Sequence, residues 1–359
     1  MKTGFEAGLS LSPFSLPRQE KQALLFSRLK ELSHHHQQHC DAYNRILTAQ
    51  QCDLTLLTDL TALPFLPVSL FKILNLQSVE TDHIVKTMTS SGTSGQQVSR
   101  IYLDKNTAAL QQKVLIKIVS DFIGAARLPM LIIDSPAVMR DRAMFSARGA
   151  GILGFSLFGS DRAYALDEEM NLNHAVLESF LTKHAGKPLL LFGFTFMVWK
   201  HFYKALQRCE GRYDLSQATL IHGGGWKKLQ AQAVSPDAFA QHLHAVCGIS
   251  RVSDYYGMVE QTGCIYMQCE HGHLHASLFS DVIIRHPQDF SVCPVGQPGI
   301  IQVLSALPES YPGHSLLTED EGILLGEDDC RCGRMGKYFR VLGRLKNAEL
   351  RGCSDTYGA

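Results

Sequence analysis

This chain of 359 residues contains no long apolar run. No segment reaches the roughly 18 consecutive apolar residues that a membrane-spanning helix requires, so we expect no membrane span. The N-terminal residues have no sustained apolar core either, and they do not resemble a secretory signal. These absences predict a cytoplasmic protein.

An excess of charge of either sign is also missing. The Lys and Arg residues number 34 and the Asp and Glu residues number 34, so the formal net charge is +0. Proteins that bind nucleic acid through phosphate contacts usually carry a basic excess, and we therefore expect no nucleic-acid partner. Cysteine is too sparse for a disulfide scaffold, with 10 residues in the chain, so these residues should be free thiols, metal ligands or nucleophiles.

The N-terminal part of the sequence carries helical patterns. Apolar side chains recur at helical spacing across residues 18–51, which predicts one helix or two in an N-terminal helical region, 1–60. The consecutive histidines His34, His35 and His36 lie in this stretch, and we expect them on a solvated face.

Short apolar runs alternate with helical patterns in residues 61–265, which we interpret as an α/β core. Such alternation predicts a largely parallel sheet, in which ligands bind at the carboxyl ends of the strands. The predicted strands lie at 129–134, 188–193 and 218–223. The predicted helices lie at 104–124, 171–184, 195–208 and 234–247.

The last part of the chain is richer in strand patterns. We expect a β-rich subdomain over 266–345, followed by a mobile tail, 346–359. Pro, Gly and Asp separate its strand candidates, which lie at 277–279, 281–284, 299–304 and 322–325.

The sharpest local signal lies at residues 89–95, which contain five hydroxyl side chains and two glycines. Small residues let backbone N–H groups approach a polyphosphate, and hydroxyls add further donors. The segment lacks the Gly-Lys-Ser/Thr ending of a P-loop, which disfavours that class of NTPase. On its own such a run is more typical of a flexible loop, so its meaning depends on the other motifs.

Five motifs together resemble those of the adenylate-forming superfamily, which includes acyl-CoA synthetases, luciferases and the adenylation domains of peptide synthetases. They occur in that superfamily's order and at plausible spacings. The motifs are Thr89-Ser90-Ser91-Gly92-Thr93-Ser94-Gly95, His222-Gly223-Gly224-Gly225-Trp226-Lys227, Asp254-Tyr255-Tyr256-Gly257-Met258-Val259-Glu260, Thr318-Glu319-Asp320 and Gly343-Arg344. The resemblance implies the large-domain fold of these enzymes, with parallel and mixed sheets flanked by helices, and it makes the core at 61–265 an adenylate-binding one.

Within the superfamily, the chain resembles the acyl-protein synthetases of bacterial bioluminescence operons. Phe71-Lys72, residues 223–227 and Glu349-Leu350-Arg351-Gly352-Cys353-Ser354-Asp355 carry this resemblance. It implies that ATP activates a carboxylic acid of the fatty-acid class, which passes as a thioester to a protein cysteine and then to an acyl reductase or acyl-carrier partner. Two alternatives stay open: an acyl- or aryl-CoA ligase that releases a soluble thioester, and a noncatalytic adenylate-binding scaffold.

For the phosphates, the resemblance assigns roles to the first motif and to Glu260. The hydroxyls of residues 89–94, together with Gly92 and Gly95, would hold the phosphates of ATP, and Glu260 would bind Mg²⁺. In the superfamily this motif continues with Gly-x-x-Lys. Here Arg100 stands nearby instead, and we expect it to replace the missing cation.

For the nucleoside, the resemblance points to three further places. Tyr256, followed by Gly257, would cover the adenine, and the glycine loop at 223–225 would let backbone pack close to it. Asp320 would accept hydrogen bonds from the ribose hydroxyls, and Arg344 would donate near the ribose or the phosphate.

The C-terminal end departs from the superfamily. Its members normally continue after Gly-Arg into a mobile lid that supplies a catalytic Lys, whereas this chain ends at residue 359, and we expect no lid domain. A partner, or a local residue such as Lys227, would then supply the charge. Cys353, after Arg351, is the candidate acyl acceptor, because a neighbouring cation favours the thiolate and related synthetases carry their acyl group on such a C-terminal cysteine. A cysteine so near the terminus can also be incidental. The predicted catalytic residues are thus Cys353, Glu260, Lys227 and Arg344.

Two Cys/His clusters have the spacing of metal ligands. Cys269-Glu270-His271-Gly272-His273-Leu274-His275 is followed by Cys330-Arg331-Cys332-Gly333, which fits a structural Zn²⁺ site. A similar pairing in phenylacetate-CoA ligases implies Cys269, His275, Cys330 and Cys332 as the ligands, with His271 or His273 as replacements for His275. Reduced cysteines and surface histidines are the alternative.

The sequence signal for the acyl pocket is the weakest of those described. Phe192, Gly193 and Phe194 lie at the end of a predicted strand and are the candidates for this pocket. An aromatic run at this place is equally typical of an ordinary core.

Overall fold

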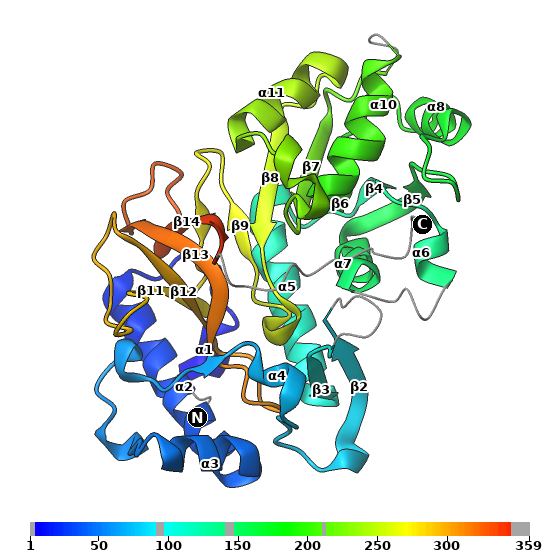
Figure 1. Cartoon of the computed structure of the whole chain (residues 1–359). Coiled ribbons are helices and arrows are strands. Elements are labelled where there is room, and N and C mark those ends of the chain that lie inside the picture. Colours follow the sequence, from blue (N-terminus) through cyan, green and yellow to red (C-terminus); the bar gives the residue numbers. More distant parts are fainter. Residues whose placement is uncertain (1–3, 91–96, 141–146, 210–212, 346–359) are drawn as a thin grey trace. The chain divides into compact units, whose positions relative to one another are not determined.

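A computed structural model describes residues 4–90, 97–140, 147–209 and 213–345, whose elements are labelled in Figure 1. The chain divides into two compact units. Among the described residues, unit 1 contains 4–90, 97–122 and 257–345, and unit 2 contains 123–140, 147–209 and 213–256. The domains predicted from the sequence are continuous stretches that end at residues 60, 265 and 345, whereas each unit combines separate stretches of the chain. The predicted domain boundaries therefore stay predictions.

Unit 2 contains the parallel sheet that the alternating pattern predicts. Its five strands are ordered β8-β7-β6-β4-β5, and each neighbouring pair is parallel. The strands are β4 Leu128–Ile132, β5 Gly159–Tyr164, β6 Leu189–Phe194, β7 Ala218–Gly223 and β8 Arg251–Tyr256. β6 is buried at every position, as expected of a strand covered on both faces.

Helices surround these strands in Figure 1 and connect them along the chain. They are α6 Ala137–Arg140, α7 Ala147–Phe155, α8 His174–Lys183, α10 Lys204–Gln207 and α11 Pro236–Cys247. α11 shows how local sequence sets the bounds: Ser235 accepts a hydrogen bond from the N–H of Ala238, and Gly248 ends the helix in the left-handed conformation.

One predicted helix has an unexpected geometry. Residues 195–208 form three consecutive segments, α9 Thr195–Met197, the π-helix η6 Val198–Tyr203 and α10. Short 3₁₀ helices, η5 Ser156–Phe158 and η7 Lys227–Gln232, complete the unit.

Unit 1 contains the β-rich C-terminal part. Its sheet has the order β11-β12-β13-β14-β10-β9 with antiparallel neighbours, and β1 pairs with β13 in parallel. The strands are β1 Leu66–Pro67, β9 Tyr266–Gln268, β10 Leu274–His275, β11 Ser280–Arg285, β12 Pro298–Ser305, β13 Ser315–Glu327 and β14 Lys337–Arg344. The fold class predicted from the sequence is thus confirmed.

The strand predicted at 277–279 is wrong, because these residues form a turn. The N–H of Phe279 donates to the hydroxyl of Ser277, and the N–H of Ser280 donates to the carbonyl of Ser277. A serine side chain thus offers the backbone a local alternative to strand pairing.

Helices and a separate hairpin complete unit 1. The hairpin joins β2 Ile84–Thr89 to β3 Arg100–Asp104. The α-helices are α1 Gly4–Gly8, α2 Arg18–His39, α3 Asp41–Ala49, α4 Leu70–Ile73 and α5 Lys105–Ile123. The 3₁₀ helices are η1 Leu54–Leu56, η2 Leu60–Ala62, η3 Thr81–His83 and η8 Val259–Gln261. Over the described residues, no helix combines the length and apolar character needed to cross a membrane.

The histidines of α2 correct a second expectation. His36 is fully buried and does not lie on a solvated face. Its Nδ1 lies 2.8 Å from the hydroxyl of Ser78, and its Nε2 lies 3.1 Å from the carbonyl oxygen of Pro308. His314 stacks on its ring, with 4.9 Å between the centroids. Long-range partners therefore satisfy both nitrogens of a histidine that local sequence makes look exposed.

Candidate functional site

The hairpin β2–β3 carries the residues predicted to hold phosphate. Thr89 ends β2 and pairs with Arg100 at the start of β3. Just beyond, the N–H of Ser90 donates to the carbonyl of Ser99 (3.2 Å), and the N–H of Ser99 donates back to the hydroxyl of Ser90 (2.9 Å). Arg100 is exposed at this end of the hairpin. The remaining members of the motif, Ser91, Gly92, Thr93, Ser94 and Gly95, lie outside the described residues.

Glu260 lies in the same unit, in the short helix η8. It is 2% exposed, and Gln261 beside it is 1% exposed. Tyr256, which ends β8 in unit 2, is half-buried, and Gly257 after it is exposed. The Glu260 carboxylate, predicted to bind Mg²⁺, is therefore shielded from water in the structure.

Asp320 and Arg344 are brought together by the pairing of β13 and β14. They are direct partners across the two strands, although 24 positions separate them in the sequence. Arg344 Nε lies 3.7 Å from Asp320 Oδ1, and its Nη2 lies 3.8 Å from Glu319 Oε2. Thr318, the first residue of this motif, donates to the carbonyl of Ile301 (2.8 Å). Within this motif, Thr318 therefore has a structural contact, whereas Asp320 forms a partly exposed ion pair with Arg344.

The glycine loop at 223–225 follows β7 in unit 2. Any Cβ on Gly223 would lie 2.6 Å from Tyr255 Cε1, and one on Gly224 would lie 2.6 Å from Phe194 Cδ1. Gly224 and Gly225 also have positive φ values of 81° and 69°. Both close packing and backbone conformation therefore require glycine here.

The predicted acyl-pocket residues lie in a buried aromatic cluster. Phe192 stacks on Phe155 with ring centroids 4.3 Å apart, and Phe155 also contacts Tyr255 at 5.0 Å. Phe194 packs against Gly151, where a Cβ would lie 3.0 Å from its ring. Sequence reasoning missed Phe155, Gly151 and Tyr255. The spacing of Gly151 and Phe155, four residues apart on α7, was the only signal.

Gly193 has a different role from its aromatic neighbours. A Cβ at this position would lie 2.8 Å from Cβ of Ile133 and 3.0 Å from Cγ2 of Val198. The glycine therefore lets β6 pack against these two side chains.

A polar contact that the motifs do not predict lies beside the glycine loop, between Thr195 and His222. Thr195 donates to the carbonyl of Gly223 (3.1 Å), so its oxygen accepts from Nδ1 of His222, 2.9 Å away. Burial lowers the pKa of His222 to about 3, so the ring stays neutral and acts as a hydrogen-bond donor. The pair holds the end of β7 against the start of α9.

Two predicted catalytic residues cannot be placed. Lys227 begins η7, but its side chain lies outside the described part of the structure. Cys353 lies outside the described residues altogether.

Four predicted metal ligands meet at the far end of the β13–β14 hairpin. The ligand atoms of Cys269, His275, Cys330 and Cys332 all lie within 4.8 Å of one another. Cys269 Sγ is 4.0 Å from Cys330 Sγ, and Cys332 Sγ is 3.3 Å from His275 Nε2. His273 also reaches this cluster, with Nδ1 3.3 Å from Cys330 Sγ.

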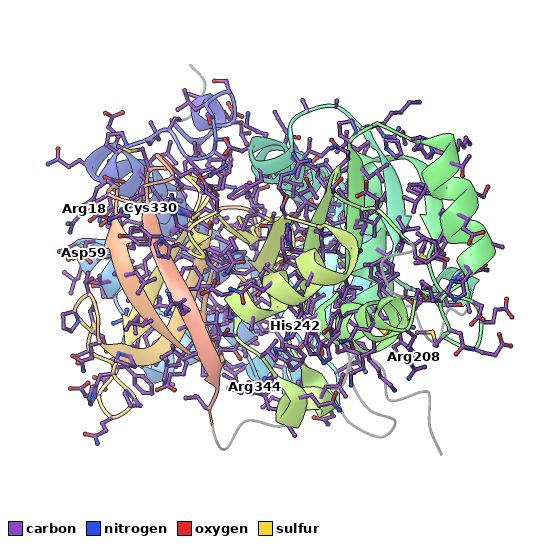
Figure 2. All side chains as sticks on the ribbon, turned by 90° about the horizontal axis from the view of Figure 1, so that it is seen from above. Arg18, Asp59, Arg208, His242, Cys330 and Arg344 are labelled. Carbon is purple, nitrogen blue, oxygen red and sulfur yellow. The ribbon has the colours of Figure 1, made fainter. Side chains whose placement is uncertain are left out.

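Burial sets the protonation of this cluster in the absence of a metal ion. Burial raises the pKa of the Cys330 thiol to about 12 and lowers the pKa of His275 to about 4. Without a cation the thiol therefore keeps its proton, whereas a bound dication stabilises the thiolate. Figure 2 shows Cys330 and Arg344 at opposite ends of the hairpin. β14 is eight residues long, about 25 Å, so the cluster is remote from the Asp320–Arg344 pair.

Comparisons with known proteins identify a family and a similar protein. A family model described as "Acyl-protein synthetase, LuxE" matches residues 6–358. The chain is 24% identical over 306 residues to the long-chain-fatty-acid–luciferin-component ligase of Vibrio harveyi. The aligned region covers 82% of this chain and 77% of that protein.

Solved structures match over nearly the whole chain. An open conformation of 2-hydroxyisobutyryl-CoA ligase, in complex with 2-HIB-AMP and CoA, gives a TM-score of 0.70 at 14% identity, covering 93% of this chain and 77% of the other. The same ligase in its postadenylation state with 2-HIB-AMP gives a TM-score of 0.69 at 14% identity, covering 92% and 69%. At this identity the likeness shows a shared fold.

Proposed function

This chain belongs to the LuxE acyl-protein synthetase family, and from that premise we propose that it joins a long-chain fatty acid to its own Cys353 in two steps. Its activity is that of an ATP-dependent, AMP-forming acid ligase. The long-chain acid is taken from the name of the Vibrio harveyi relative.

The two steps solve one chemical difficulty, which is that a carboxylate is a poor electrophile. In the first step, a carboxylate oxygen attacks the α-phosphorus of ATP, and the bond from that phosphorus to the bridging oxygen of pyrophosphate breaks. In the second step, the Cys353 thiolate attacks the acyl carbon, and AMP leaves with the electrons of the C–O bond.

The Asp320–Arg344 pair is the observation that carries the proposal. Strand pairing places a carboxylate that can accept from ribose hydroxyls beside a guanidinium that can donate to phosphate, 3.7 Å apart. Both side chains keep partial exposure, so a nucleotide could reach them.

Glu260 fits a Mg²⁺ ligand, because Mg²⁺ is usually held by one or two carboxylates together with substrate phosphates, and this carboxylate is buried. When bound, the ion would neutralise charge that develops on the phosphates. Thr89 and Ser90 would donate to phosphate from the end of their hairpin, and Arg100 would add a fixed positive charge. Lys227 is the proposed further cation for adenylation.

Unit 2 would supply the contacts to adenine and acid. Tyr256 and the glycine loop at 223–225 would hold the adenine, since the loop keeps its backbone free of side chains. The aromatic cluster around Phe192 and Phe194 would contact the acyl chain, because aromatic rings commonly line apolar ligand pockets.

The thioester requires a recipient. We take this to be an acyl reductase or an acyl-carrier protein, since a protein-bound thioester is an activated intermediate rather than an end product. The reaction would take place in the cytoplasm, where ATP is available and thiols stay reduced, in keeping with the free state of every described cysteine.

The Cys/His cluster would hold a structural zinc ion. Thiolates about 2.3 Å from a tetrahedral zinc lie about 3.8 Å apart, and the Cys269–Cys330 sulfur separation of 4.0 Å agrees with that. Four protein ligands would leave no open position for substrate, so the ion would tie β9–β10 to the β13–β14 hairpin without taking part in catalysis.

Zinc content tests this assignment. We expect about one zinc per wild-type chain, much less in Cys330→Ser, and no change in Cys293→Ser, which alters a buried cysteine outside the cluster. A wild-type protein that holds no zinc after growth in zinc-replete medium would contradict it.

Intact mass spectrometry tests the main proposal. The purified protein is incubated with ATP, Mg²⁺ and a series of fatty acids, and its mass is measured before and after hydroxylamine treatment. We expect an ATP-dependent gain of one acyl group that hydroxylamine removes. The gain should be lost in Cys353→Ser and kept in Cys209→Ser, a half-buried control.

Each other outcome has a definite meaning. An equal gain in Cys353→Ser would overturn the acceptor. Acyl-CoA in the presence of CoA, with no gain on the protein, would indicate a CoA ligase. Failure of every acid to release pyrophosphate would favour the scaffold.

A further inference from the structure

The loop at 306–314, between β12 and β13, is unusual because it is buried. Every residue in it except Glu309 is shielded from solvent, whereas connecting loops normally run over the surface. A buried loop must satisfy its backbone polar groups within the protein. The contacts that do so lead to Glu260.

Gln261, the residue after Glu260, is the first of these contacts. Its side-chain Nε2 donates to the carbonyl of Gly313 in the loop (2.8 Å) and to the carbonyl of Val303 in β12 (3.1 Å). Both hydrogens of one buried amide are therefore used to fix the chain directly beside the predicted Mg²⁺ ligand.

Gly313 contacts Glu260 itself. A Cβ on Gly313 would lie 2.7 Å from the carbonyl oxygen of Glu260 and would also clash with the ring of Tyr311. The loop backbone thus lies directly against the backbone of Glu260. The helix η8 has only three residues and cannot hold that backbone by its own hydrogen bonds.

The loop is in turn attached to α5 and to the hairpin that carries the phosphate motif. Gln111 on α5 donates to the hydroxyl of the fully buried Tyr311 (3.2 Å). The hydroxyl of Ser310 donates to the carbonyl of Tyr102 in β3 (2.7 Å). Through these contacts, the loop connects the backbone of Glu260 with the β2–β3 hairpin inside unit 1.

We propose that Gln261, with the buried loop at 306–314, is a positioning residue that holds the Glu260 carboxylate in place for Mg²⁺·ATP. This inference rests on the proposed function, in which Glu260 binds Mg²⁺. A ligand that is held in place by its neighbours binds metal without first losing conformational freedom, and loss of such supporting contacts typically costs roughly 10–100-fold in metal affinity or activity.

Gln261→Met tests the inference, because methionine has a similar volume and no donors. We expect the Mg²⁺ concentration for half-maximal, acid-dependent pyrophosphate release to rise roughly 10-fold or more, with most of the rate recovered at saturating Mg²⁺. Gln302→Met is the matched control. Gln302 is also a fully buried glutamine, but it bonds to Arg285 and Ser315. This control should lower thermal stability without changing the Mg²⁺ requirement.

Tyr311→Phe is the second variant, and it decides the matter if Gln261→Met does not fold. It removes only the hydroxyl that accepts from Gln111, so we expect a smaller rise in the Mg²⁺ requirement, about 2- to 10-fold. An unchanged Mg²⁺ requirement in both variants, when Glu260→Gln raises it, would overturn the positioning role. A wild-type protein that releases no pyrophosphate with any acid would instead overturn the proposed function.

Discussion

Replacing His314 by glutamine should flatten the pH dependence of the stability of unit 1 between about pH 7 and pH 5. His314 is buried and stacks on His36. The hydroxyl of Ser33 gives its hydrogen to the carbonyl of Leu29, so it accepts from Nε2 of His314, 2.9 Å away. These surroundings suit the neutral ring, because burial and the nearby charges of Arg28 and His35 disfavour its protonation.

The magnitude follows from the difference between folded and unfolded pKa values. Burial lowers the pKa of His314 to about 3, and the charges of Arg28 and His35 act in the same direction. In the unfolded chain the pKa returns to about 6.5. Unfolding therefore takes up a proton below that pH. The contribution of His314 is fully present above pH 6.5 and is lost as the pH falls toward its folded pKa.

This loss is about 1.4 kcal/mol per pH unit, or about 2 kcal/mol on going from pH 7 to pH 5. The pKa of His36 is also lowered well below its usual range, first by burial and then by His314. Protonation of His36 should therefore lower the stability of unit 1 in the same direction as protonation of His314. The loss of about 2 kcal/mol from His314 is by itself a large part of the total stability of a typical domain.

The assay must report on unit 1. Both tryptophans, Trp199 and Trp226, belong to unit 2, so their fluorescence does not do so. Hydrogen exchange of peptides from α2 and from residues 306–314, measured against urea and corrected for the intrinsic effect of pH, gives the free energy directly. His314→Gln should lose about 2 kcal/mol less than wild type between pH 7 and pH 5. His34→Gln, at a half-exposed position of α2, is the control. An equal loss in His314→Gln and wild type would refute the reasoning.

Two further predictions concern the nucleotide residues. Gly224→Ala places a methyl group 2.6 Å from Phe194 at a φ of 81°, so it should cost about 1–3 kcal/mol and raise the KM for ATP. Gly225→Ala is the control, because no atom lies within 4 Å of its new Cβ and the substitution adds only backbone strain. Thermal unfolding compares the stability of the two variants, and pyrophosphate exchange compares their KM for ATP. Arg344→Lys keeps the charge near Asp320 but loses the forked donor, so the KM for ATP should rise roughly 10-fold with little change in Tm. An unchanged KM in pyrophosphate exchange would contradict the role of Arg344.

Three of the five strands of the sheet in unit 2 could be predicted because their signal is local, whereas β5 and β8 were not predicted. β4, β6 and β7 are short apolar runs, and the strands of a parallel sheet are buried on both faces. β13 was only partly predicted, at 322–325, although it extends over Ser315–Glu327. Its polar segment Thr318-Glu319-Asp320 interrupts the apolar pattern. If these side chains bind nucleotide as proposed, function and strand periodicity make different demands on the same positions.

His36 shows why the N-terminal helices were harder to interpret. Its partners are Ser78 and the carbonyl of Pro308, which lie 42 and 272 positions away in the sequence. A histidine whose two nitrogens are satisfied only in the folded chain has the same local pattern as a solvated one. Burial of polar side chains therefore depends on tertiary contacts that periodicity does not record.

The same limit separates the residues proposed to touch ligands from those proposed to hold them in place. Motifs mark Glu260, Asp320 and Arg344, because the proposed chemistry requires particular groups at particular spacings. No pattern marks Gly313, yet a Cβ there would lie 2.7 Å from the carbonyl oxygen of Glu260. Space alone makes glycine as necessary at this position as in the loop at 223–225. Gln261 is equally unmarked, because its two acceptors are backbone carbonyls, which any sequence would provide. Residues that act by supporting a backbone can therefore be found only when the contacts themselves are known.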